Sequence, residues 1–443
     1  MNFHLHLPRC VMSGLIGLAL VAVLPASAQE TAPAVTVLKA ARLFDGTRDT
    51  TIANGVVVIE GGTIKAVGSG LAVPAGATVI DLGDATLLPG IIDAHVHLTG
   101  ESGDNWYKDV VDGLRRGVPE QAVRATELAK RTLLSGVTTV RNVGAGDFVD
   151  VGLRNGIDAG VVPGPRMLVA TSSLGSRGGH CDDTGFPYLL FGHESGIQDG
   201  IAAGPDQFRD AVRFAVKYGA DVIKVCASGG VLSLGDAVDT PQLTQAEMDA
   251  LVDEAHHLRK RTAAHSHGAA AAKVAVRAGI DSIEHGSFLD DEAVRMMKEK
   301  GTYLVPTAMA VEYTGRRPRN FPPEIAAKAK AAAEAHSAAM KRAVAAGVTI
   351  AFGTDSGVSP HGKNAEEFGL LVQYGGLSPA AALRTVGASA RLMGIEKETG
   401  TLEAGKLADV IAVPGDVLAD VRATEKVLFV MRAGKVYRND RAR

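Results

Sequence analysis

The middle of the chain alternates short apolar runs with longer amphipathic stretches, and this alternation constrains the fold more than any other feature. Eight runs are rich in strand-forming residues: 87–95, 138–143, 166–171, 221–225, 262–265, 281–285, 302–306 and 348–353. Helical patterns separate them, among them 121–134, 205–218, 245–261, 269–278, 291–300 and 323–346. Such alternation predicts an α/β protein with a parallel sheet. With eight units we expect a (β/α)8 (TIM) barrel over residues 87–395. An open doubly wound sheet is the alternative, but no Gly-rich phosphate-binding turn supports it.

Both ends of this region are flanked by short strand-like runs separated by Gly and Asn turns. The runs before it are 35–38, 55–60 and 63–67, and the runs after it are 409–413, 427–431 and 434–437. Neither set can bury both of its faces alone. We therefore expect a small composite β-sandwich domain, formed by residues 29–86 and 396–443 together.

The first 28 residues resemble a signal peptide. Arg9 supplies a basic start, residues 11–24 are apolar, and Ala26-Ser27-Ala28 fits a cleavage site before Gln29. The apolar run is shorter than the roughly 20 residues that a membrane span needs. We expect a periplasmic or secreted protein without membrane association after cleavage. An uncleaved anchor is the alternative.

Charge and cysteine content exclude several classes of protein. The formal net charge of −3 gives no reason to expect nucleic acid as a partner. Cys181 and Cys226 are the cysteines left after the expected cleavage, so a framework of several disulfides is excluded. We expect two buried thiols. A single disulfide in an oxidising compartment is the alternative.

Several residue types typical of metal ligands follow the predicted strands. His95 and His97 lie on the same face of one strand, because side chains alternate with a period of two. His265 and His285 each end a strand-like run shortly before a glycine. Asp355 follows an apolar run, where a carboxylate is costly unless it is paired or bound to a cation; helix capping is its alternative role. Since barrel strands end on one face, these residues predict one metal site.

Lys224 lies inside the apolar run 222–225, where an isolated ammonium is costly. Burial and nearby cations lower the pKa of a lysine. A neutral lysine can take up CO2 to form a carbamate, whose two oxygens can bridge two metals. A buried salt bridge is the alternative.

From residue 36 to 438 the chain resembles the amidohydrolase superfamily with two metals. The motifs that carry the resemblance are residues 89–97, Lys224 with 227–231, His265, 284–286, 353–355 and 402–409. Within the superfamily the chain is similar to the imidazolonepropionase-like group. That group includes Xaa-Pro dipeptidases and the secreted bacterial ochratoxin A-hydrolysing amidohydrolases.

The resemblance implies a site for two divalent metal ions, which we expect to be zinc. The ligands are His95, His97 and Asp355 for the more buried metal, and His265 and His285 for the other. A CO2-derived carbamate on Lys224 bridges the two. A hydroxide between the metals is the expected nucleophile. Asp355 takes its proton and passes it to the leaving amine.

The loops after the strands are expected to select the substrate. His180 and His267 are candidates to contact the tetrahedral oxyanion or a substrate carboxylate; a hydrogen bond behind the metal ligands is the alternative for His267. Tyr313 and Arg317 lie in the loop after the seventh strand. An arginine fork suits a free carboxylate, and a solvated basic turn is the alternative.

These features predict a hydrolase that cleaves the amide bond of an N-acyl amino acid or dipeptide with a free carboxylate, with ochratoxin A as a candidate substrate. A cyclic amide or lactone hydrolase using the same site is the alternative. A metal-binding protein without catalysis is a third reading. Asp355 argues against it, because purely structural sites are closed by their ligands. We expect a small-molecule substrate and a homo-oligomer.

Overall fold

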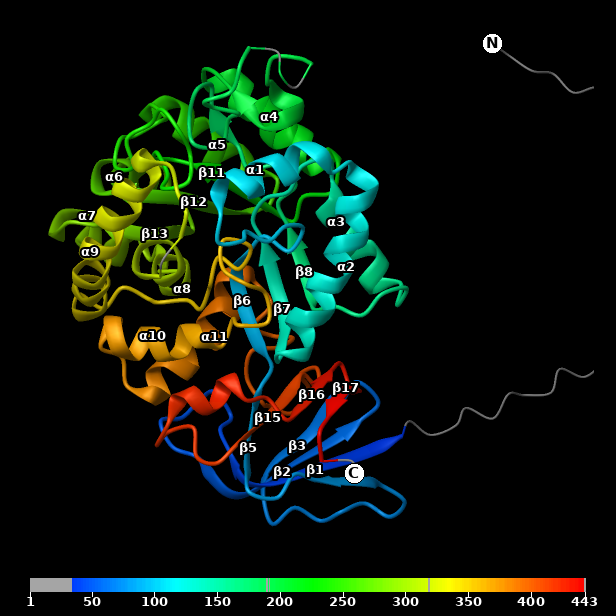
Figure 1. Ribbon diagram of the computed structural model, residues 1–443. Coiled ribbons are helices and arrows are strands. Elements are labelled where there is room, and N and C mark those ends of the chain that lie inside the picture. Colours follow the sequence, from blue (N-terminus) through cyan, green and yellow to red (C-terminus); the bar gives the residue numbers. More distant parts are fainter. Residues whose placement is uncertain (1–33, 189, 191, 318, 442–443) are drawn as a thin grey trace, which may run out of the picture. The chain divides into compact units, whose positions relative to one another are not determined.

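Two parallel sheets form the centre of the chain, in a computed structural model that describes residues 34–188, 190, 192–317 and 319–441. The first sheet has the order β6 (Ile91–Val96), β7 (Val137–Asn142) and β8 (Arg166–Val169). The second has the order β11 (Val222–Cys226), β12 (Arg261–Gly268), β13 (Ser282–Phe288) and β14 (Tyr303–Val305). All neighbouring strands run parallel, which confirms the α/β class (Figure 1). The expected signal peptide, residues 1–28, lies outside the described residues.

Isolated parallel bridges connect the two sheets at both of their edges. The bridged pairs are Leu174 with Val225, Leu304 with Ile350, and Val96 with Ser356. The first pair joins the segment after β8 to β11, and the other two join β14 to β6 through residues 350–356. The pairings therefore run in a ring, so that the carboxyl ends of the strands gather on one side. The predicted strand 348–353 contributes only an isolated bridge to this ring.

Helices alternate with these strands and pack apolar faces against them. The longer helices are α2 (Val118–Leu134), α3 (Val149–Asp158), α4 (Pro205–Lys217), α5 (Gln245–His257), α6 (Ala269–Ala278), α7 (Asp291–Lys300), α9 (Pro323–Ala345), α10 (Glu366–Gly375) and α11 (Pro379–Met393). Helix α5 begins with a capping box between Thr244 and Glu247. It ends earlier than predicted, because Arg259 adopts a positive φ of 58°. No helix in the described part of the chain is long and apolar enough to cross a membrane.

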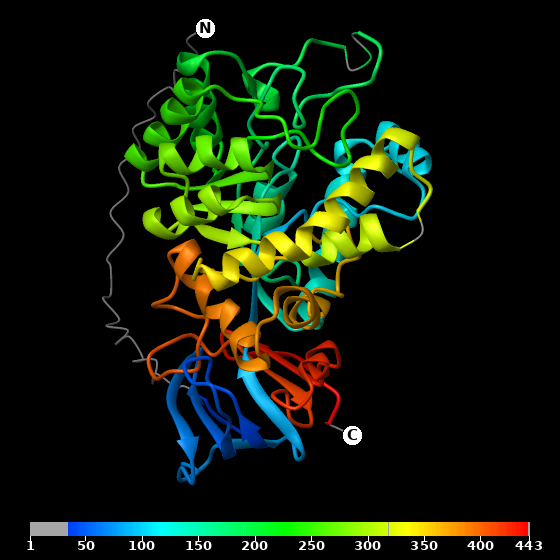
Figure 2. The ribbon, with the colours of Figure 1, turned by 90° about the vertical axis from the view of Figure 1, so that its left-hand side faces the viewer.

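Helix α1 and several shorter elements surround the carboxyl ends of the strands. They are α1 (Trp106–Arg115), β9 (Gly175–Ser176), a 3-10 turn (Ile197–Asp199), β10 (Ile201–Ala202), α8 (Ala308–Val311) and a π-helical turn (Glu312–Arg316). The long helix α9, yellow in Figure 2, contacts both β13 and the π-helical turn. Loops and helix α9 therefore supply the walls above the strand ends.

Strands from both ends of the described chain share one eight-stranded sheet. They are β1 (Val35–Leu43), β2 (Ile52–Glu60), β3 (Thr63–Ser69), β4 (Thr78–Asp81), β5 (Ala85–Pro89), β15 (Val410–Pro414), β16 (Phe429–Arg432) and β17 (Lys435–Asn439). A 3-10 turn (Val421–Glu425) lies between β15 and β16. We expected a sandwich of separate sheets, but β5 pairs with both β1 and β15 and makes the sheet continuous. Its two halves share one apolar cluster that includes Val57 and Phe429.

Candidate metal centre

The six predicted ligands meet at the carboxyl ends of the parallel strands and line one cavity. His95 lies in β6 with His97 just after it, Lys224 in β11, His265 in β12, His285 in β13 and Asp355 in the segment 350–356. Two groups of ligand atoms each lie within 4.8 Å of one another: His95, His97 and Asp355, and His265, His267 and His285. The described residues thus offer two adjacent groups of side chains that can hold metal ions.

Hydrogen bonds leave one nitrogen of each predicted ligand histidine free. Nδ1 of His95 donates to Glu284 at 2.7 Å, and Nδ1 of His97 donates to the carbonyl of Gly144 at 3.1 Å. In both rings Nε2 is then the free nitrogen. His265 is reversed, because its Nε2 donates to the carbonyl of Gly229 at 3.2 Å and leaves Nδ1 free. Such partners fix the tautomer and the orientation of metal-binding imidazoles.

Glu284 is the centre of a buried polar network that sequence reasoning missed. Its side chain is fully buried and accepts hydrogen bonds from His95 and from Nη2 of Arg141 at 2.9 Å. Nε of Arg141 donates to the carbonyl of Ala94 in β6. A lone buried charge would be costly, but these partners satisfy both charges. The sequence did indicate this network, because Arg141 and Glu284 are charged residues inside apolar strand-like runs, as Lys224 is.

Asp355 has an unpaired oxygen that points at the two histidines of its group. Oδ1 is buried without a hydrogen-bond partner in the described chain, 3.5 Å from Nε2 of His95 and 3.4 Å from Nε2 of His97. The free Nε2 atoms and Oδ1 can each only accept a hydrogen bond, so no hydrogen bond connects them. Burial raises the pKa of Asp355 to about 7, and a bound cation would oppose this shift. The three atoms fit a divalent cation between them.

Backbone conformation holds these side chains in place. Asp355 and His285 both have a positive φ, 57° and 71°, which is uncommon for residues with side chains. The turn at Asp355 is held by Asp93, which accepts hydrogen bonds from Thr354 and Asn364. Strained residues of this kind concentrate at functional sites.

Lys224 is buried at 3% exposure, and its ammonium makes no hydrogen bond or ion pair with any described residue. The buried salt bridge, which was the alternative role for Lys224, is therefore absent among the residues that the structure describes. Burial lowers the pKa of Lys224 to about 8. This shift enlarges the fraction of neutral amine, the form that reacts with CO2, although the ammonium still predominates at pH 7.

The remaining predicted contact residues divide into two pairs. His180 and His267 line the cavity, and the His180 ring centroid lies 4.2 Å from that of His265. Tyr313 and Arg317 are not among the residues that line it, and their contact with substrate stays a prediction. The π-helical turn directs them toward α10, where the Arg317 guanidinium stacks on the Tyr313 ring and pairs with Glu366 at 3.0 Å.

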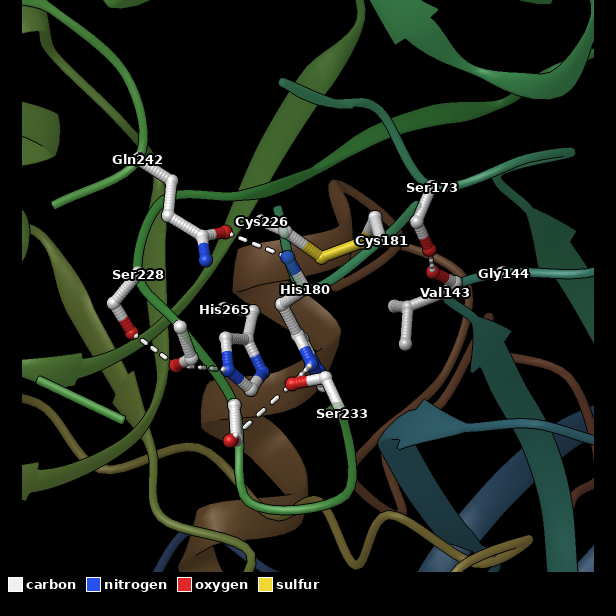
Figure 3. The surroundings of a disulfide bond; sticks show 12 residues. Val143, Gly144, Ser173, His180, Cys181, Cys226, Ser228, Ser233, Gln242 and His265 are labelled. Carbon is white, nitrogen blue, oxygen red and sulfur yellow. Dashed lines mark hydrogen bonds between the residues drawn. A yellow bond between two sulfur atoms is a disulfide. The ribbon is translucent and has the colours of Figure 1, made fainter. Parts of the chain in front are cut away.

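A disulfide links Cys181 to Cys226 beside the cavity, which corrects our expectation of two free thiols (Figure 3). Their Cα atoms are 6.0 Å apart, within the usual range for a disulfide. Cys226 ends β11, two residues after Lys224, and Cys181 follows His180. The sequence separation concealed this proximity, which depends on how the loop after β9 folds back over β11.

Histidine and carboxylate side chains gathered at the carboxyl ends of parallel strands define the class of metal-assisted hydrolases. The chain belongs to the amidohydrolase family, whose sequence profile matches residues 86–437. Families of this kind are typically metal-dependent, in agreement with the two ligand groups.

Individual relatives support the same assignment. The ochratoxinase of Aspergillus niger is 32% identical over 424 residues, which cover 91% of this chain and 87% of the relative. A solved Xaa-Pro dipeptidase with methionine bound in its active site is 37% identical, with a TM-score of 0.87, covering 92% of this chain and 100% of that one. The solved A. niger ochratoxinase has a TM-score of 0.80 at 30% identity, covering 92% and 96%. The protein is thus a hydrolase that acts on amide bonds.

Proposed function

We propose that this protein hydrolyses the amide bond of an N-acyl amino acid or a dipeptide with a free carboxylate, and that ochratoxin A is among its substrates. One observation carries the proposal: the unpaired Oδ1 of Asp355 faces the free Nε2 atoms of His95 and His97 in a cavity. The relatives support the substrate class, since one is named for ochratoxin and another holds an amino acid in its active site.

Two divalent metal ions, zinc in our proposal, would occupy the ligand groups. His95, His97 and Asp355 would hold one and His265 and His285 would hold the other, while Lys224, as a carbamate, would offer oxygen ligands to both. Bound ions of this charge lower the pKa of water and polarise a carbonyl oxygen. Asp355 accepts the proton of the attacking water and delivers it to the leaving amine.

The apolar part of the cavity lining suits the hydrocarbon parts of such a substrate. Its residues are Val231, Leu232, Ala310, Val311, Ala332 and Val358. No arginine is among the residues that line the cavity, so the substrate carboxylate has to be recognised by other groups. Ser173 and Thr314 also line the cavity, but their hydroxyls donate to the carbonyls of Val143 and Ala310 at 2.9 and 2.8 Å. His267 therefore remains the predicted candidate for that contact.

The proposal extends to the architecture and the location of the protein. The ring of pairings is then a closed (β/α)8 barrel, and residues 29–86 with 396–443 form the companion domain. A signal peptide over residues 1–28 would direct the protein to the periplasm or the medium and would then be removed.

A substrate panel with and without chelator tests the activity. N-acyl amino acids, Xaa-Pro dipeptides and ochratoxin A should be hydrolysed faster than lactones or cyclic amides. Prolonged chelation should abolish the activity, and added zinc should restore it. Elemental analysis should find two metals per chain. A stoichiometry of one after reconstitution would contradict the two-metal site, and faster turnover of lactones would favour the cyclic-substrate alternative.

Export is tested separately. Protein expressed with its own leader should begin at or near Gln29 and be recovered from the periplasm or medium, because the apolar run is too short for a span. N-terminal sequencing of each cell fraction measures this. An intact Met1 in the membrane fraction would support the uncleaved anchor.

A further inference from the structure

A chain of polar side chains runs from His180 away from the cavity to helix α9. Nδ1 of His180 lies 2.8 Å from Oγ of Ser233 (Figure 3). The same Oγ lies 2.8 and 2.9 Å from the two carboxylate oxygens of Asp236. Nζ of Lys328 donates to Asp236 at 2.8 Å and to the carbonyl of Ser233 at 2.6 Å. The loop after β11 is thereby tied both to α9 and to the segment that carries His180.

The serine hydroxyl has one proton and three neighbours that could accept it: Nδ1 of His180, the carboxylate of Asp236 and, at the longer distance of 3.4 Å, the carbonyl of Gly230. Asp236 remains ionised: burial opposes this, but hydrogen bonds from Lys328 and Ser233 hold its pKa below the ordinary value. An ionised carboxylate accepts hydrogen bonds and donates none. It is also a stronger acceptor than a neutral imidazole nitrogen. The Ser233 proton is therefore directed to Asp236, and Nδ1 of His180 must carry its own proton and donate it to Ser233.

The packing around His180 leaves the other ring nitrogen for the cavity. A Cβ added at Gly230 would lie 2.1 Å from Nδ1 and Cε1 of the His180 ring, so the loop after β11 covers that edge closely. The backbone N–H of His180 donates to Oε1 of Gln242, and Nε2 of Gln242 donates to Asp236. Asp236 thus holds both the ring and the backbone of His180.

We propose that Asp236 is a positioning residue that, through Ser233, keeps His180 in the Nδ1–H tautomer, so that Nε2 offers the substrate a hydrogen-bond acceptor. Such a group matches an N–H of the substrate, which in an N-acyl amino acid other than an acylated proline is the N–H of the scissile amide. It disfavours an oxyanion or carboxylate, the partners that the sequence suggested for His180. The contact between Nε2 of His180 and the substrate N–H rests on the proposed amide hydrolysis. The Nδ1–H tautomer of His180 does not depend on it.

The test is Asp236→Asn in the metal-loaded enzyme. The amide of the new side chain can donate to Ser233, whose proton is then free to go to Nδ1 of His180, and the ring changes to the Nε2–H tautomer. We expect kcat/KM for N-acyl phenylalanine to fall about 10- to 100-fold. The matched ester of phenyllactate has no N–H, so its hydrolysis should fall much less. Asp239→Asn is the control, since Asp239 is exposed in the same loop and makes no hydrogen bond.

Nitrogen-15 NMR of histidine-labelled protein reads the tautomer without turnover, with His180→Gln identifying the ring signals. Wild type should show Nδ1–H, and Asp236→Asn should show Nε2–H. If Asp236→Asn does not fold, Ser233→Ala should still remove the Nδ1–H preference. A wild-type ring protonated on Nε2, or equal losses for amide and ester, would overturn the proposal. Absence of amide hydrolysis in wild type with the expected tautomer would instead refute the proposed function alone.

Discussion

Asp355→Asn is expected to lower kcat by about 100- to 10,000-fold, the range for loss of a general acid–base group. The substitution keeps the size of the side chain and one oxygen, but it removes the carboxylate that can hold a proton. Asp355 is the one carboxylate in its ligand group, and its neighbours there are Nε2 of His95 and of His97, at 3.5 and 3.4 Å. No second carboxylate in that group can therefore take over its role. Steady-state kinetics on the best amide substrate measure the loss.

Metal content separates the two roles of Asp355. The other predicted ligands remain in the variant, so its metal content should fall much less than its activity. Asp239→Asn, the same change in an exposed position, should leave both unchanged. Full activity with both metals bound would show that another group moves the proton. A loss of activity that follows metal loss alone would leave Asp355 as a ligand only.

Lys224→Ala is expected to lose most activity and at least part of the metal, since it removes the proposed bridge. The side chain is buried and unpaired, so its loss breaks no hydrogen bond or ion pair in the described chain. Short carboxylic acids such as acetate or propionate fit the space that is vacated and offer two oxygens. They should restore part of the activity in a concentration-dependent way, as measured by kinetics together with elemental analysis.

Lys341→Ala is a suitable control, because Lys341 is exposed on α9 and is not among the residues that line the cavity. It should show neither the loss nor the rescue. Near-normal activity and metal content in Lys224→Ala would exclude a carbamate bridge. Loss without rescue, in a protein that is folded and still holds its metals, would point to a role for the ammonium itself.

The residues of the candidate centre were visible in the sequence because each breaks a local rule. His95, Lys224 and Asp355 place a polar or charged group in or directly after an apolar strand, where burial is costly without a partner. Alternation of strands and helices then implied that strand ends meet, so distant residues could be assigned to one site. Both inferences depend on local pattern and on a topological rule that needs no coordinates.

Loop geometry and side-chain direction depended on tertiary structure alone. Tyr313 and Arg317 follow the expected strand, and a π-helical turn places both beside Glu366, which no local pattern indicated. The disulfide between Cys181 and Cys226 depends on a loop folding back over β11.

The sequence by itself determined the α/β class and indicated which histidine, lysine and aspartate side chains gather at the candidate metal centre, because polar residues in apolar strands stand out in the pattern. Only the tertiary structure decided which nitrogen each histidine presents, because a tautomer depends on the partner that folding brings to the other nitrogen. Glu284 and Ser233 are such partners for His95 and His180. Each is far from its histidine in sequence, so no local pattern could reveal the pair.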